Sequence, residues 1–413
     1  MKSAIGHGTE KLYYTDAYMK EFDAVVLYCE PVCGSAQEAA SPRFHVVLDR
    51  TAFFPEEGGQ SPDRGILTDG QTAQVSDVQI RDGIITHVTD IPFKPGTQVH
   101  GVLDFRHRFS NMQQHSAEHL YSGLVYSRLG LVNKGFHLSD SEVTMDYSGP
   151  ISEEEAAALE MEVNRLIWKN IESRQEFPSP EELKSYDYRS KTAIDGQVRL
   201  VIFPGCDICA CCAPHVARTG EIGLFKVISV QSHRGGVRIH MLAGERAFRF
   251  LADGNAVLTE AARSLSTSPE KVPGLIGKLR TDLYEARHAL SEAKLALLMK
   301  EADEIPVSER DVCLFTDSLE EPVLREAVNR LMTIHDGVCG IFNGNDTEGY
   351  RYVIGSTTDV LTMQKCLKDE LQARGGGRPP MIQGQIHASR SAVEELFFRK
   401  HSLCDEAGRS EKQ

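Results

Sequence analysis

Short runs of β-branched and apolar residues fill the first hundred positions, and Gly, Pro and Asp separate them. Such runs at regular spacing predict strands joined by turns. We therefore expect a small β-barrel or sandwich between about Tyr13 and Phe105. Its predicted strands cover residues 24–30, 44–50, 73–80, 83–90 and 97–105.

The apolar spacing changes to a helical period after residue 105. Met112, His115 and His119 share one face of a helix predicted over 106–129, and Gly130 follows as its stop signal. A Ser-x-x-Glu capping box predicts a second helix over 152–168, and Ser-Pro-Glu-Glu predicts a short one from residue 179. Strands are expected at 198–203, 224–229 and 237–242.

The remaining chain divides into a helical arm and a small α/β domain. Between residues 256 and 302 the composition shifts to Ala, Leu, Glu, Lys and Arg with a helical leucine stripe, and Pro273-Gly274 predicts a break in it. Strand and helix patterns alternate again after residue 307. We therefore predict an α+β fold with four parts: a β-barrel (1–105), an α+β core (106–251), a helical arm (252–306) and a C-terminal α/β domain (307–413).

Composition narrows the class of protein. The 413 residues are 41% hydrophobic and 25% charged, which is typical of globular chains of about two to three domains. No apolar run reaches the roughly 18–20 residues of a membrane span, and the N-terminus lacks the apolar stretch of a secretion signal. We expect a cytoplasmic protein with no membrane partner. A net charge of −14 argues against a general nucleic-acid coat but permits a local patch or pocket.

Histidine and cysteine residues form two pairs with metal-ligand spacing. His115 and His119 stand at i and i+4 on the predicted helix, so both imidazoles reach one ion. Cys211 and His215 have the same separation, although Pro214 predicts a loop there. Three imidazoles and a thiolate suit zinc.

The sequence also permits other interpretations of this cysteine-rich segment. Cys206-x-x-Cys209 is an alternative source of a ligand, and a cysteine-rich loop with inert thiols is the structural alternative. Glu118 directly precedes His119, so the H-E-x-x-H motif of metalloproteases is absent from this segment.

These motifs resemble those of a known family. HSAEHL and CCAPHV are similar to the zinc motifs of the alanyl-tRNA synthetase editing domain and of the free-standing AlaX editing proteins. FFPEEGGQSPDRG (53–65) resembles the family's glycine motif, and GVRIHMLAGERA (236–247) resembles the strand that ends the editing domain. GGGRPPMIQGQ (375–385) is similar to the signature of the C-terminal domain. The order of these motifs is that of the long AlaX form.

The resemblance implies roles for individual residues. It makes His115, His119, Cys211 and His215 the ligands of one zinc ion per chain. It places Asn133, Glu118 and Gln60 in the catalytic pocket, and Glu56, Gly58 and Gly59 in the glycine motif beside it. Three departures bear on these roles: Glu57 replaces a glycine, Glu118 a threonine tied to substrate discrimination, and 212–214 the usual Gly-Gly-Thr.

The implied activity is hydrolysis of the ester in tRNA(Ala) mischarged with serine or glycine. An alanine pocket cannot strongly reject either amino acid, so a second site must remove the product. Two alternatives remain: a non-catalytic tRNA-binding protein with the editing fold, and a zinc hydrolase of small-molecule esters. Sequence leaves open whether zinc activates water or positions the substrate. Glu118 is a candidate general base or a solvated helix carboxylate.

Contacts to the tRNA body are expected from a few basic residues. Lys134 follows Asn133, and Arg374 and Arg378 flank three glycines that let backbone approach a phosphate. A linker is the alternative interpretation of that glycine segment. The helical arm or the C-terminal domain is a candidate contact for a homodimer.

Overall fold

The computed structural model describes residues 8–32, 42–190, 196–317, 319–358 and 360–399. The chain folds into two compact units, Met1–Leu258 and Thr259–Gln413. The predicted α+β class is confirmed, because helices and strands occur in both units. In the described part of the chain, no helix is both long and apolar enough to cross a membrane.

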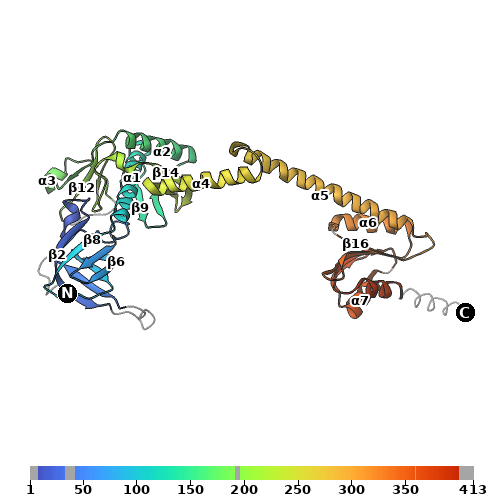
Figure 1. Ribbon diagram of the computed structural model, residues 1–413. Helices are drawn as coiled ribbons and strands as arrows, with labels where there is room; N and C mark the ends of the chain where they lie inside the picture. Colours follow the sequence, from blue (N-terminus) through green and yellow to red (C-terminus); the bar gives the residue numbers. More distant parts are fainter. Residues whose placement is uncertain (1–7, 33–41, 191–195, 318, 359, 400–413) are drawn as a thin grey trace. The chain divides into compact units, whose positions relative to one another are not determined.

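Six strands of the N-terminal region close into a barrel, so the barrel alternative is the correct one (Figure 1). Buried and exposed side chains alternate along these strands, as a barrel wall requires. Two short elements precede the barrel in the chain: β1 (Glu10–Lys11) and the turn η1 (Leu12–Tyr14). β1 pairs with β4 (Arg50–Thr51), which follows β3. The barrel order is β2 (Glu21–Pro31), β3 (Phe44–Leu48), β7 (Ile84–Thr89), β6 (Thr72–Arg81), β5 (Gly65–Thr68) and β8 (Gln98–Leu103).

Helix α1 (Phe105–Leu129) starts directly after the barrel and carries the first histidine pair. Asp104 caps its N-terminus by accepting from the His107 N–H, and Gly130 ends it with φ of 66°. Arg108 on α1 forms an ion pair with Asp63 in which both side chains are fully buried. This pair fixes α1 against the segment that contains the glycine motif.

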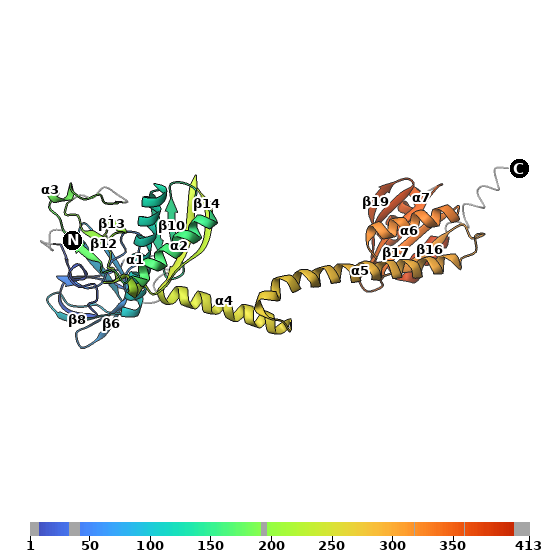
Figure 2. The ribbon, with the colours of Figure 1, turned by 90° about the horizontal axis from the view of Figure 1, so that it is seen from above.

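The second half of the first unit surrounds α1 with two small sheets (Figure 2). α2 (Glu153–Trp168) contacts both α1 and β14, and its predicted capping box at Ser152 is present. One sheet has the order β14 (Phe225–His233), β15 (Gly236–Ala243), β10 (Val143–Tyr147) and β9 (Asn133–Leu138). The other contains β11 (Arg174–Glu176), β12 (Leu200–Phe203) and β13 (Asp207–Ala210). The short helix α3 (Pro180–Leu183) packs against β12 through Leu183, whereas the turn η2 (Thr219–Ile222) contacts α1 and α2.

The helical arm breaks earlier than its sequence predicted. α4 (Gly244–Ser264) ends before the turn η3 (Pro269–Lys271), and α5 (Val272–Asp303) then begins. The predicted break at Pro273-Gly274 is therefore wrong. Pro273 stands in the first turn of α5, where its missing N–H costs the helix no hydrogen bond.

The second unit ends in a five-stranded mixed sheet. α6 (Glu321–Ile334) and α7 (Val360–Leu371) contact its strands, and the end of α5 packs beside α6 and β16. The linker interpretation of the glycine segment is wrong, because that segment is an edge strand paired with β20. The sheet order is β16 (Val312–Thr316), β17 (Val338–Asn345), β18 (Gly349–Ser356), β20 (Met381–Ile386) and β19 (Arg374–Arg378).

Candidate metal centre

The two predicted ligand pairs meet in the core of the first unit. His115 and His119 lie one turn apart on α1 and are at most 2% exposed. Cys211 directly follows β13, and His215 stands in the loop after it, where Pro214 predicted irregular backbone. The ligand atoms of these four side chains all lie within 4.8 Å of one another.

The spacing inside the cluster fits a tetrahedral ion. The Cys211 Sγ lies 3.6 Å from His115 Nε2 and 3.3 Å from His215 Nε2. A tetrahedral zinc ion with Zn–N of about 2.0 Å and Zn–S of about 2.3 Å separates nitrogen and sulfur ligands by roughly 3.5 Å. The donor set of three imidazoles and one thiolate therefore fits zinc in both type and spacing.

Each histidine of the cluster is oriented through its other ring nitrogen. His115 Nδ1 lies 2.8 Å from Gln60 Oε1, and His215 Nδ1 lies 3.1 Å from Ser116 Oγ. His119 Nδ1 lies 3.0 Å from the Asp207 carboxylate. Such contacts fix ring orientation and leave each Nε2 for a metal ion.

The Asp207 carboxylate is itself held from a second side. The guanidinium of Arg189 donates to both Asp207 oxygens, at 2.7 and 2.9 Å. Buried carboxylates with such a bidentate partner keep their charge. Despite burial, the bonds from His119 and Arg189 hold the Asp207 pKa below its usual value.

Electrostatics inside the cluster favour a thiolate. Burial alone would raise the pKa of the Cys211 thiol, but the imidazoles of His115 and His215 hold it well below its ordinary value. Burial, together with the charge of His119, lowers the His215 pKa to about 3. Burial alone would lower the His119 pKa, yet bonds to Asp207 and Cys211 raise it to about 9. The buried thiolate is the form that binds a metal ion.

The other cysteines of the segment occupy different environments. Burial raises the pKa of both the Cys206 and the Cys209 thiols, so each stays protonated at neutral pH. Cys206 Sγ lies 3.5 Å from the Leu120 carbonyl oxygen. Cys209 belongs to a second group of possible donors with His119 and Asp207. Because His119 and Asp207 already bond to each other there, Cys211 is the better ligand.

Glu118 is a buried carboxylate beside the cluster, so the interpretation as a solvated helix side chain is wrong. Its Oε1 accepts from Asn133 Nδ2 at 2.6 Å and from Ser122 Oγ at 2.7 Å. Its Oε2 lies 3.9 Å from His119 Nε2. Ser122 Oγ also lies 2.7 Å from the Tyr147 hydroxyl, which completes a polar network behind the carboxylate.

The glycine motif brings Gln60 to this site. Gly58 and Gly59 have φ of 63° and 84°, and a Cβ on Gly59 would lie 2.1 Å from the Phe136 carbonyl oxygen. Only glycine therefore fits at position 59. The loop pairs with the end of β9 through the Gly59 carbonyl and the Leu138 N–H, at 2.7 Å. Glu57 stands where the family's glycine motif has a glycine. Its φ is not positive, so a side chain at this position creates no backbone strain.

The predicted tRNA contacts lie at the surface of separate elements. Lys134 is exposed on β9, and Arg374 and Arg378 are exposed at the two ends of β19.

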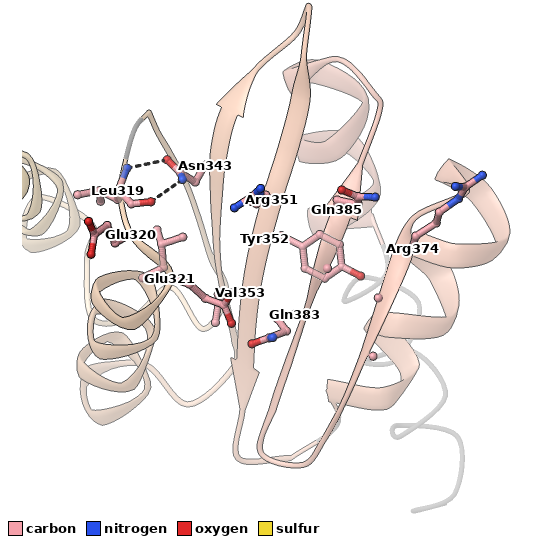
Figure 3. A pocket seen from close by; sticks show the side chains of 14 residues that line it. Leu319, Glu320, Glu321, Asn343, Arg351, Tyr352, Val353, Arg374, Gln383 and Gln385 are labelled. Carbon is pink, nitrogen blue, oxygen red and sulfur yellow. Dashed lines mark hydrogen bonds between the residues drawn. The ribbon is translucent and has the colours of Figure 1, made fainter. Parts of the chain in front are cut away.

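Arg374 borders a pocket of about 700 Å³ over the C-terminal sheet, whereas Arg378 does not line it (Figure 3). Gly375 and Gly384 lie against the Tyr352 hydroxyl, where a Cβ on either would be within 2.9 Å of it. Arg351, Gln383 and Gln385 face the same pocket.

Comparison with known proteins relates the whole chain to one group of enzymes. Residues 3–107 match the family model for class II (A) tRNA synthetases, and residues 198–240 match the second additional domain of threonyl and alanyl tRNA synthetases. The second match contains both Cys211 and His215. The alanine–tRNA ligase of Ignicoccus hospitalis is 31% identical over 94% of this chain and 42% of its own length.

Further relatives give the same result. The alanine–tRNA ligase of Pyrococcus furiosus is 31% identical over 96% of this chain and 44% of its own length, and that of Halobacterium salinarum is 32% identical over 89% and 41%. Over nearly its whole length, the chain is therefore similar to part of alanyl-tRNA synthetase. It spans less than half the length of the curated relatives that it matches. RecJ from Thermus thermophilus aligns with only 31% of the chain and 19% of its own length, at a TM-score of 0.23 and 16% identity, so no shared fold follows.

Several groups around the histidine–cysteine cluster had no signal in the sequence. Asp207, Ser116, Ser122 and Arg189 are ordinary polar residues until the fold brings them to the cluster. Ser116 is the one with a positional cue, because it directly follows His115 on the same helix. Asp207 is the first residue of β13, and the Arg189 backbone N–H donates to Ile208 of the same strand. No spacing along the chain links either residue to His119.

Proposed function

We propose that this AlaX-like chain is a trans-editing hydrolase that deacylates tRNA(Ala) mischarged with serine or glycine, with zinc as its metal. The observation that carries the proposal is the buried cluster of His115, His119, Cys211 and His215 with Glu118 beside it. The relatives' name, alanine–tRNA ligase, supports tRNA(Ala) as the nucleic acid whose mischarged forms are the substrates. A thiolate ligand needs a reducing compartment, which supports a cytoplasmic location.

Bound zinc would supply positive charge that polarises the ester or orients its polar groups. Four protein donors complete a tetrahedral shell, so we assign the proton transfers to Glu118. Glu118 accepts a proton as water adds to the ester carbonyl, and returns it to the ribose oxygen as the acyl C–O bond breaks. A buried carboxylate on a rigid helix suits this role.

The neighbouring residues are proposed to position these groups. Asn133 and Ser122 both donate to Glu118 Oε1, which leaves Oε2 on the side of the histidine cluster. Gln60 holds the His115 ring through Nδ1. We therefore assign Asn133 and Gln60 to positioning, and Gly58 and Gly59 to the loop that delivers Gln60.

We propose that the C-terminal pocket binds the body of the tRNA. Arg351 and Arg374 supply cationic groups, and the glycines of β19 leave backbone accessible beside them. Glu320 and Glu321 line the opposite wall, so the cationic side is confined to β18 and β19. Lys134 and Arg378 are further candidate phosphate contacts.

A deacylation assay tests the proposal. Seryl-, glycyl- and alanyl-tRNA(Ala) are incubated with the purified chain, with and without a chelator. We expect loss of the seryl or glycyl ester, survival of the alanyl ester, and dependence on metal. If both noncognate esters persist while the tRNA binds, the chain is instead a non-catalytic tRNA-binding protein. Hydrolysis of a simple ester without action on any aminoacyl-tRNA would favour the small-molecule hydrolase.

A further inference from the structure

Two side chains of this protein occupy positions where the family's motifs have glycine, and these two side chains meet. Glu57 belongs to the glycine motif, and Cys212 directly follows Cys211 in the ligand loop, the segment 211–215. The Cys212 thiol donates a hydrogen bond to the Glu57 carboxylate. A Cβ on Gly58 would lie 3.6 Å from Cys212 Sγ, so the glycine motif packs directly on the ligand loop. A polar pair therefore fills space that two glycines would leave open.

Both members of this pair are held next to the histidine–cysteine cluster. The Gln60 N–H donates to the Glu57 carbonyl oxygen at 3.1 Å, and Gln60 Oε1 lies 2.8 Å from His115 Nδ1. Nη1 of the buried Arg199 donates to the two carbonyl oxygens of the residues on either side of Cys212, at 2.7 and 2.9 Å. Glu57 is thus one end of a turn whose other end contacts a candidate metal ligand.

One oxygen of the Glu57 carboxylate is available to a ligand. Its Oε2 atom is buried and has no hydrogen-bond partner in the part of the chain that the structure describes. The Lys11 ammonium lies 3.9 Å from this oxygen and 3.4 Å from the Tyr14 hydroxyl. The Glu57 side chain as a whole is 33% exposed, so a ligand can reach it from solvent. A carboxylate oxygen in this state favours a cationic hydrogen-bond donor.

Two other carboxylates beside the cluster have different partners. The Asp207 oxygens bond to His119 and to the Arg189 guanidinium. Glu118 accepts two hydrogen bonds at Oε1, and its Oε2 lies 3.9 Å from His119 Nε2, where it serves the proposed proton transfer. Glu57 is therefore the carboxylate that is left to bind a cationic group of a substrate.

We propose that Glu57 binds the protonated α-amino group of the amino acid that is esterified to tRNA. This inference rests on the proposed function, because an aminoacyl ester is the substrate that carries such a group. The contact anchors the amino acid beside the ligand loop without touching its side chain. Glu57 therefore selects for a free α-amino group and does not distinguish serine from glycine. Cys212 is a positioning residue, because it holds the carboxylate.

Binding of an analogue that resists hydrolysis tests the proposal without turnover. The probe is a short acceptor RNA with serine joined to its 3′ end by an amide, in a free-amine form and an N-acetylated form. We expect the wild type to bind the free-amine form about ten-fold or more tightly. Glu57→Gln should bind both forms alike, whereas Glu10→Gln, an exposed change on β1, should keep the preference. A wild type without the preference, or a Glu57→Gln variant that retains it, overturns the proposal.

Kinetics separate this inference from the proposed function. Glu57→Gln should raise KM for seryl-tRNA about ten-fold, with kcat and metal content unchanged, and Cys212→Ala should have a smaller effect in the same direction. A wild type that deacylates seryl-tRNA but does not prefer the free-amine probe keeps the proposed function and loses the role of Glu57. A wild type that prefers this probe but hydrolyses nothing supports the role of Glu57 and contradicts the hydrolase.

Discussion

Four cysteines stand within seven residues of one another, but their thiols lie in different environments. The Cys211 thiol lies among three imidazoles and has a lowered pKa, whereas burial without such partners raises that of Cys209. The proposed metal site therefore depends on which thiol faces the histidines. Glu118 likewise differs in its environment from the exposed acidic residues of the chain, because it is buried and one of its oxygens accepts from two donors.

Replacing single cysteines tests this assignment. Cys211→Ala should lose the metal, because three imidazoles alone bind zinc less well than the full set. Cys209→Ala should keep a stoichiometric metal ion, because its thiol is protonated. Metal analysis of both purified variants against the wild type makes the comparison, and loss of metal in Cys209→Ala alone would transfer the ligand role to that residue.

Glu118→Gln tests the proposed proton transfer. The amide keeps the size of the side chain but cannot accept the proton, so we expect kcat for deacylation to fall by about 100-fold or more. The metal content should be unchanged. Ser122→Ala, which removes one donor to the same oxygen, should have a much smaller effect. A Glu118→Gln variant with wild-type kcat would exclude the residue as the base.

The sequence pointed to the four candidate metal ligands that the fold brings together, but not to the roles of the groups that orient them. Two pairs of His and Cys at i, i+4 spacing carry their chemistry in residue type alone. Gln60, Ser116 and Asp207 bond to the histidines from three different segments, and only tertiary packing brings these segments together. Long, capped helices such as α2 were equally clear. β9 and β13 escaped prediction because they are short and contain Gly, Asn or Cys.

The barrel contains its own titratable group, the fully buried His87. Its ring lies 2.8 Å from Thr51 Oγ1 and 3.1 Å from the Val46 carbonyl oxygen. Burial lowers its pKa from 6.5 to about 4. The folded barrel therefore keeps His87 neutral while the unfolded chain protonates it, and stability present above pH 6.5 is lost as the pH falls toward 4.

His87→Gln should remove this part of the acid sensitivity. Between pH 7.5 and 5.0 the His87 linkage costs the wild type about 2 kcal/mol of unfolding free energy. Calorimetry of wild type and variant at both pH values should show a smaller downward shift of the barrel transition in the variant. His288→Gln, at an exposed position on α5, serves as the control. Equal shifts in wild type and His87→Gln would contradict the linkage.

The chain combines a unit that contains the histidine–cysteine cluster with a second unit that presents the C-terminal pocket. If that pocket contacts tRNA phosphates, Arg374→Ala should weaken the binding of intact tRNA. The slope of log affinity against log salt concentration should fall by the contribution of about one phosphate contact. Deacylation of a short acceptor-stem mimic should be unchanged, since the mimic lacks the tRNA body that the pocket is proposed to bind. Arg330→Ala, an exposed change on α6, is the matched control. Equal losses with both substrates would argue against docking at this pocket.

We propose that three imidazoles and one thiolate bind a single ion. Zinc K-edge X-ray absorption of the purified wild-type chain, combined with metal analysis, tests it most directly. We predict one zinc per chain with three nitrogen ligands and one sulfur ligand near 2.3 Å, about the usual Zn–S distance. A shell with two or more sulfurs, or a folded chain that binds no zinc, would contradict this ligand assignment.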